Sequence, residues 1–362
     1  METRPDATEV ELVARGMATA VAPAGGLTPV QASLLGAITR AVTEIEIDYL
    51  ALDPLGCEEL AAVLAGRGPE YRRRIVHHMV LAELVLAPLP DEVAERVTAY
   101  AAALGIDDDF VRIARRYARG TLGLAWCDLR RSGFADRWDD DTKLEPLHAA
   151  AAAEDPFEET PLDPELAARW QAFGALPEGT LGRDVFEMYR ARAFFWPGTR
   201  HAASPQLAQH DFVHVIADYG TTIEGELEVF GLIGRADPDP KGFAWLATVV
   251  GLFETGFVHQ QGFFEVNVRE RHLSTPGNEV RLADAIRRGK RVCEALDRDL
   301  LTVDYHELAP LPIGEVRERL HVPPKSPDAI AAGSAGPFEP GGISEFQREA
   351  AARERASGST TP

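Results

Sequence analysis

This chain of 362 residues is predicted to be all-α, and three observations carry that prediction. Apolar residues recur at three- and four-residue spacing over most of the chain, which is the period of one helix face. No segment shows the alternation of apolar and polar residues that a half-buried strand requires. Helix-capping sequences precede several of the periodic segments. We therefore expect two helical domains, joined by an acidic linker and followed by a disordered tail.

The first helical domain is expected over residues 1–135. Thr28 and Gln31 form the two polar positions of a capping box, with Pro29 at the first helical position between them. Further amphipathic segments lie near residues 57–66, 69–87, 90–104 and 107–131. This domain contains no motif that predicts a function.

The linker is expected over residues 136–164, which contain ten acidic residues against Arg137 and Lys143, together with four prolines. A second helical domain is expected over residues 165–325. The tail, residues 326–362, is rich in Pro, Gly, Ser and Ala, and a disordered segment is typical of that composition, with at most a transient helix expected over residues 343–356.

The composition excludes several classes of protein. A formal net charge of −20 argues against a nucleic-acid partner and against electrostatic attachment to anionic lipid. The longest apolar run, residues 243–253, is shorter than the ~20 residues that span a membrane, and no signal-peptide pattern begins the chain. The three cysteines are scattered, which fits a reducing compartment. We expect a cytoplasmic protein with at most peripheral membrane contact.

The second domain contains a cluster of residues that commonly bind metals. His210 and His214 lie one turn apart on the expected helix, and Asp211 precedes His214 by three residues on the same side. Ser204 and Pro205 read as a helix start just upstream. Two imidazoles with carboxylates suit Zn²⁺, Fe²⁺ or Mn²⁺ better than Ca²⁺ or Mg²⁺, which prefer oxygen ligands.

Glu226 is the fourth candidate ligand. It lies within an apolar helical stripe, whereas Glu224 and Glu228 are expected on the opposite, solvated side. A carboxylate among apolar residues is costly unless it is paired or bound to a metal. The alternative is that the histidines are ordinary surface or core residues and that Glu226 forms a buried ion pair.

Two further sets of candidates accompany these ligands. Asp218 follows His214 by four residues, and it could orient a histidine, donate a proton or simply be solvated near the helix end. Residues 243–268 are apolar nearly all round and are expected to form a buried helix. Aromatic residues of that segment are candidates for lining a slot for a prenyl tail: Trp245, Phe253, Phe257 and Phe263.

The motif HDxxH, followed after eleven residues by Glu, resembles the signature of the Coq4 family of ubiquinone-biosynthesis proteins. The similarity extends to residues 176–183 (LPEGTLGR), to Arg288 and Gly289, and to residues 311–322 (LPIGEVRERLHV). It covers roughly residues 165–325. The N-terminal block lies outside it.

The resemblance implies a divalent metal, zinc first and iron or manganese next, bound by His210, Asp211, His214 and Glu226. It also implies action on a polyprenylated hydroxybenzoate-type ring, whose C1 carboxyl group is replaced by a hydroxyl, and other quinone-biosynthesis enzymes as partners. Two alternatives stay open: a non-catalytic prenyl-lipid-binding scaffold with a structural metal, and an HD-type metal phosphohydrolase, whose core dipeptide is His-Asp. Oligomerisation is compatible with each of them.

Overall fold

The computed structural model describes residues 5–86, 89–107, 162–199, 202, 208–238, 242, 246, 250, 272–296 and 298–357. The predicted all-α class is confirmed within these ranges. They contain helices and no β-strand, and an isolated bridge joins Thr180 to Pro312.

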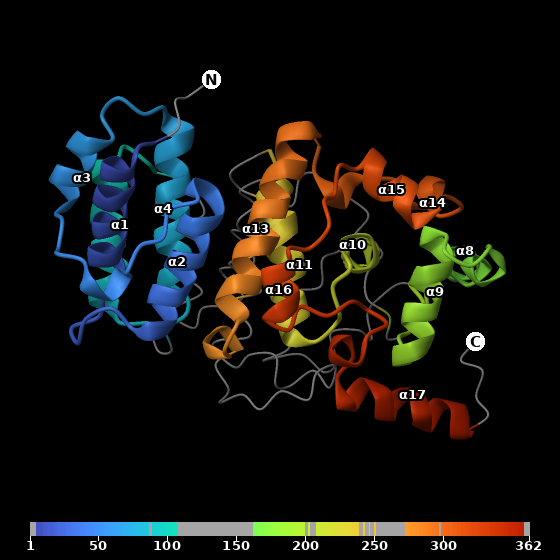
Figure 1. Cartoon of the computed structure of the whole chain (residues 1–362). Coiled ribbons are helices and arrows are strands. Elements are labelled where there is room, and N and C mark those ends of the chain that lie inside the picture. Colours follow the sequence, from blue (N-terminus) through green and yellow to red (C-terminus); the bar gives the residue numbers. More distant parts are fainter. Residues whose placement is uncertain are drawn as a thin grey trace.

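The N-terminal part is a helical bundle arranged around α1 (Figure 1). Its helices are α1 (Ala7–Val21), α2 (Pro29–Thr43), α3 (Cys57–Val63), α4 (Pro69–Glu83) and α5 (Asp91–Ala103), with a 3₁₀ helix at Tyr49–Ala51. The capping box predicted at the start of α2 is confirmed, because Thr28 and Gln31 each accept a hydrogen bond from the other's backbone NH. The Gln31 amide also donates to the carbonyls of Val21 and Ala82, so this residue links α2 to α1 and α4.

The remaining helices build the second part of the molecule. They are α8 (Pro164–Ala172), α9 (Leu181–Arg192), α10 (Gln209–Ala217), α11 (Ile223–Ala236), α13 (Asn278–Ala295), α14 (Tyr305–Leu308), α15 (Ile313–Arg319), α16 (Pro327–Ala331) and α17 (Glu345–Ser357). Short 3₁₀ helices lie at Phe173–Ala175, His272–Ser274, Leu300–Thr302 and Pro340–Gly342. Of the expected linker, residues 162–164 are described, and Asp163 caps α8. The rest of the linker lies outside the described residues.

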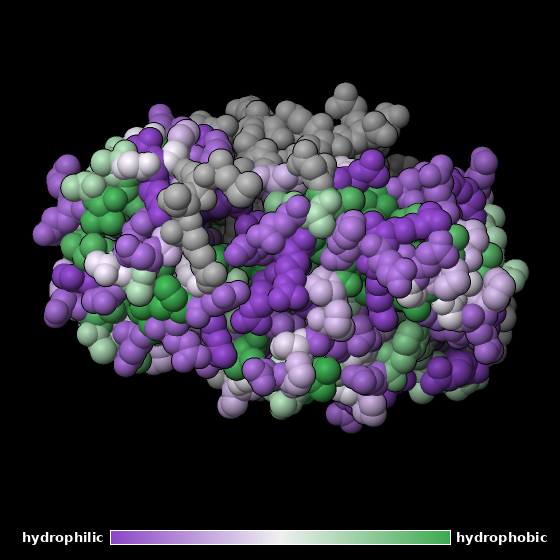
Figure 2. Space-filling model, turned by 45° about the horizontal axis from the view of Figure 1, so that its top comes forward, coloured by the Kyte–Doolittle hydropathy of each residue, from purple (hydrophilic) through white to green (hydrophobic). Residues whose placement is uncertain are grey.

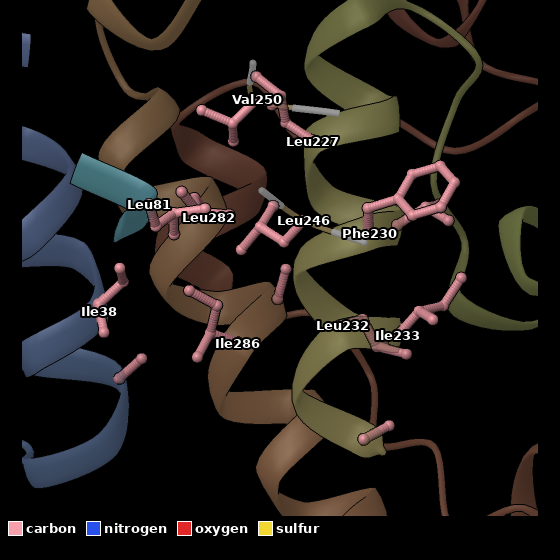
Figure 3. Close-up of a cluster of buried hydrophobic side chains, with 14 of the residues drawn as sticks. Ile38, Leu81, Leu227, Phe230, Leu232, Ile233, Leu246, Val250, Leu282 and Ile286 are labelled. Atoms are coloured by element: carbon pink, nitrogen blue, oxygen red, sulfur yellow. The ribbon is translucent and has the colours of Figure 1, made fainter. Parts of the chain in front are cut away.

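The centre of this part is the pair α11 and α13, which pack side by side (Figures 1 and 3). Gly289 permits their close approach, since a Cβ there would lie 2.3 Å from the backbone oxygen of Leu232. Leu246 and Val250, from the apolar segment expected to be buried, are fully buried beside this pair. The N-terminal bundle packs on the other side of α13 through α2, and Lys290 donates to the carbonyl of Val42. The two predicted domains therefore meet in a continuous apolar core.

The disorder expected for residues 326–362 is not found over residues 326–357. This range forms α16, a 3₁₀ turn and α17, and it buries Ala329, Ser334, Gln347 and Ala351. A composition rich in Gly and Ala is typical of disorder, but here the small residues let the backbone pack directly onto the α10–α11 connection. The prediction was wrong for this range because composition alone does not show which small residues have packing partners.

Hydrophilic residues cover much of the face shown in Figure 2, with hydrophobic residues interspersed among them. This is the mixed surface expected of a chain with 26% charged residues. Among the described helices, none combines the length and the apolar character needed to cross a bilayer.

Candidate metal centre

The candidate metal centre is held by α10 and α11 and by the short connection between them. Asp218 ends α10 in the left-handed conformation, and the Thr222 hydroxyl caps α11 by accepting a hydrogen bond from the NH of Gly225. The connection is tight, because a Cβ on Gly225 would lie 2.0 Å from the carbonyl oxygen of Gly220. This turn brings Glu226, in the first turn of α11, against the histidines of α10.

Three of the four predicted ligands form one group. His210, Asp211 and His214 each offer a donor atom, and these atoms lie within 4.8 Å of one another. Glu226 faces both histidines: Oε1 lies 3.2 Å from Nε2 of His214, and Oε2 lies 3.5 Å from Nε2 of His210. Nε2 of His210 also lies 3.6 Å from Oδ1 of Asp211. All four predicted side chains are therefore brought together.

The distances fit a shared cation. Two ligands of a tetrahedral zinc ion, each about 2.0–2.1 Å from the metal, are about 3.3–3.4 Å apart. The separations of 3.2 to 3.6 Å lie close to that value, and they are equally the distances of histidine–carboxylate ion pairs, so the buried ion pair considered for Glu226 is also present. Within the described part of the chain, the buried Nε2 of His214 has no hydrogen-bond partner, although it faces the Glu226 carboxylate. A metal would satisfy this nitrogen, which a buried polar atom otherwise requires.

Burial and charge act in opposite directions on Glu226. Burial alone would raise the pKa of its carboxyl group, but His214 and His210 together hold that pKa well below its usual range. Glu226 is therefore anionic at neutral pH. His214 is fully buried, and His210, with 12% of its side chain exposed, is the most open of the four ligands.

Two neighbours orient the ligands. The phenol of Tyr189, on α9, donates a hydrogen bond of 2.5 Å to Oδ2 of Asp211. Nδ1 of His214 lies 3.3 Å from the carbonyl oxygen of Tyr219, which directs Nε2 toward the other ligands. Metal-binding histidines commonly have such a partner on their second nitrogen. Tyr189 could not be predicted from the sequence, because it lies 22 residues before Asp211 and helical periodicity gives no signal over that distance.

Two arginines, Arg288 and Arg317, hold the end of α10. Arg317 donates to the carbonyls of Val215 and Ile216. Arg288 donates to the carbonyl of Ala217 and packs over the ring of Tyr219. Cations at a helix C-terminus are favourable, and here they also satisfy its free carbonyls.

Two segments far apart in the sequence meet next to α10. The NH groups of Leu181 and Gly182 donate to the carbonyls of Leu311 and Ala309, and the NH of Ile313 donates to the carbonyl of Gly179. Residues 176–183 and 311–322 therefore form one unit that leads into α9 and α15.

Asp218 does not orient a histidine, which was one of the roles considered for it. Its left-handed conformation turns the carboxylate away from the histidines and toward Lys325, whose Nζ lies 3.1 Å from Oδ2. The carbonyl of Tyr219 occupies the place beside His214 instead. Helical periodicity predicts where a side chain points only while the helix continues, and α10 ends at Ala217, one residue before Asp218.

Of the two glutamates expected on a solvated side, Glu228 contradicts the expectation, whereas Glu224 keeps 24% of its side chain exposed. Glu228 is buried and pairs with Arg281 of α13 at 2.6 Å. Glu224 lies 3.4 Å from Nδ1 of His272. The reason is that α11 is covered on both sides, by α10 on one and by α13 on the other.

Several predictions fall on residues that the structure does not describe. Ser204, Pro205 and the prenyl-slot candidates Trp245, Phe253, Phe257 and Phe263 all lie outside the described ranges. Among the described residues, no further histidine joins His210, Asp211 and His214, although an HD-type phosphohydrolase would need one.

Comparison of the chain with protein-family models, with curated proteins and with solved structures found no match. The family resemblance therefore depends on the quoted residues alone.

Proposed function

We propose that this protein binds a divalent metal at His210, Asp211, His214 and Glu226 and acts in isoprenoid-quinone biosynthesis on a polyprenylated hydroxybenzoate-type ring. The observation that carries the proposal is the group of His210, Asp211 and His214 on α10, whose donor atoms lie within 4.8 Å of one another, together with Glu226 of α11, which faces both histidines. The spacing of these residues and the flanking segments supply the substrate class. Zinc suits the donor set, and iron or manganese suits it as well.

Each of the four residues would have its own role in such a site. Asp211 and Glu226 offset the charge of a dication, and His214 anchors it from the buried side. The more exposed His210 leaves an approach for a ring acid. When bound, the metal would supply a positive charge that holds the carboxylate or phenolate of the substrate and stabilises charge as carbon dioxide leaves. Replacement of carboxyl by hydroxyl, with release of carbon dioxide, is a net oxidation, so a consumed oxidant such as dioxygen is required. A redox-active metal at the site or a partner enzyme would have to activate it.

The proposal is tested by purifying the chain from a quinone-producing host and measuring metal content, bound lipid and turnover. Conversion of a carboxylated prenyl ring to the hydroxylated ring by the wild type, and its loss in the folded His210→Ala/Glu226→Ala variant, is the expected result. A co-purified prenyl lipid without conversion would favour the scaffold instead. Equal conversion by wild type and variant would contradict a role for these four ligands.

A further inference from the structure

Residues 334–347, here called the clamp segment, lie directly on the α10–α11 connection, residues 218–222. The NH of Gly220 donates to the carbonyl of Ala335, and the NH of Thr221 donates to the carbonyl of Gly342. The distances are 2.8 and 2.9 Å. The connection that sets Glu226 against the histidines is therefore held by residues more than a hundred positions further along the chain.

Gln347 adds side-chain contacts to these backbone contacts. Its amide nitrogen donates to the carbonyl of Thr221, and its amide oxygen accepts from the Thr221 hydroxyl, both at 3.0 Å. Gln347 is 2% exposed and belongs to the capping box that begins α17 with Ser344. A neutral side chain thus fixes Thr221, five residues before Glu226, without contacting any ligand.

Arg192 connects the same place to α9. Its buried guanidinium donates to the carbonyls of Pro337 and Gly342 in the clamp segment and to the hydroxyl of Thr221. Arg192 lies three residues after Tyr189, which holds Asp211. Its burial and its contacts make Arg192 a structural link between α9, the clamp segment and the connection.

Glycines make the fit between the two segments close. A Cβ on Gly342 would lie 1.8 Å from the carbonyl oxygen of Gly336, and one on Gly220 would lie 2.3 Å from Cα of Gly342. A Cβ on Gly336 would lie 2.3 Å from Oδ1 of Asp218. Each of these positions excludes a side chain, so the clamp segment and the connection have one way of packing together.

We propose that the clamp segment is a positioning element of the metal centre and that its docking and metal binding strengthen each other. The inference rests on the proposed function in one respect, namely that the site binds a metal. Gln347 and Gly342 act through residues 218–222, which set the separation of Glu226 from His210 and His214. Coupling between two sites is reciprocal, so a metal that favours the docked segment must be bound more tightly when the segment is docked.

The test measures zinc affinity of the full chain by competition with a chromophoric chelator, in wild type and in two variants. Gln347→Ala removes the contacts to Thr221, and Gly342→Val makes the backbone fit impossible. Both are expected to weaken zinc binding about 10- to 100-fold, as is usual for residues that orient ligands. Because Gln347→Ala preserves the backbone fit, it keeps the test valid should Gly342→Val fail to fold.

Matched controls exist in the same chain. Gln31→Ala removes another buried capping-box glutamine, far from the metal centre. Gly314→Ala places a methyl group in open space. Both should retain wild-type zinc affinity. Hydrogen exchange provides the reciprocal measurement: zinc should slow the amides of residues 334–357 in wild type and leave them unchanged in His210→Ala/Glu226→Ala.

The outcomes are distinct. Zinc affinity equal to wild type in both clamp variants, with a lowered melting temperature of the metal-free protein, would show a merely structural segment and overturn the inference. Exchange of residues 334–357 that zinc does not alter in wild type would also overturn it. If wild type binds no zinc, iron(II) or manganese(II), the proposed function fails first, and the coupling fails with it.

Discussion

The phenol of Tyr189 donates a 2.5 Å hydrogen bond to Oδ2 of Asp211, which leaves Oδ1 turned toward His210. Burial and the neighbouring carboxylate raise the pKa of Tyr189 well above its usual value, so the phenol keeps its proton and remains a donor. The two oxygens of Asp211 thus have different roles. One is held by α9, and the other is free to bind a metal.

Tyr189→Phe is therefore expected to weaken zinc binding about 10- to 100-fold, because Asp211 loses the partner that orients it. Tyr305→Phe is the matched control, since its buried hydroxyl donates to the carbonyl of Leu300 and contacts no ligand. Isothermal titration of zinc into both metal-free variants measures the difference. Equal affinities for the two variants would show that Tyr189 does not position Asp211.

Glu226 and Glu228 lie two residues apart but are expected to have different roles: the first in zinc affinity, the second in the stability of the fold. Arg281→Met leaves the buried Glu228 carboxylate without its cation and should lower the free energy of unfolding by about 3–5 kcal/mol, with zinc affinity unchanged. Glu226→Gln should instead reduce zinc affinity. Urea unfolding and zinc titration of both variants provide the test. A loss of zinc affinity in Arg281→Met as large as that in Glu226→Gln would refute this separation.

The packing of α11 on α13 predicts a strong effect at Gly289. A methyl group there would meet the backbone of Leu232, which cannot move independently of its helix, so Gly289→Ala should cost about 1–3 kcal/mol or more. Gly36→Ala, on α2 with open space around it, should instead stabilise the protein by up to about 1 kcal/mol. Thermal unfolding of both variants compares them. A Gly289→Ala variant as stable as wild type would mean that the helices are further apart.

A buried histidine in the N-terminal bundle predicts a dependence of stability on pH. Burial, with a smaller contribution from Arg74, lowers the pKa of His78 to about 3. In the unfolded chain a histidine titrates near about 6.5. Between these values the unfolded state binds a proton that the folded state does not, so the free energy of unfolding falls as pH falls below about 6.5.

The size of this effect is about 2 kcal/mol between pH 7 and pH 5 for one histidine. His78→Gln should lose that part of the pH dependence, while other groups contribute equally to both proteins. Urea unfolding of wild type and variant at the two pH values gives the difference. An identical change in both proteins would show that His78 is protonated in the folded state.

The parts of this structure that could be predicted from sequence depend on residues close together in the chain. The capping box of Thr28 and Gln31 spans one helical turn, and His210 and His214 are one turn apart. Over such distances helix geometry fixes the contacts whatever the rest of the chain does. The approach of Glu226 to these histidines also follows from a short connection between two helices.

The contacts that could not be predicted from the sequence depend on packing between segments that are far apart in the chain. Helical periodicity places Glu226 and Glu228 on opposite faces of α11, but it cannot show that α13 covers the face of Glu228. Gln347 reaches Thr221 from 126 residues away, and the helical pattern around Gln347 gives no indication of this contact. Such contacts require the tertiary structure.

The most direct measurement of the central claim is the metal content and zinc affinity of the purified full chain, compared with His210→Ala/Glu226→Ala. If the four side chains form one site, wild type holds about one zinc, iron or manganese ion per chain, as their single set of ligands implies. The variant, folded as judged by circular dichroism, holds none. Full metal occupancy in the folded variant, or a wild type that binds none of these ions, would contradict the assignment.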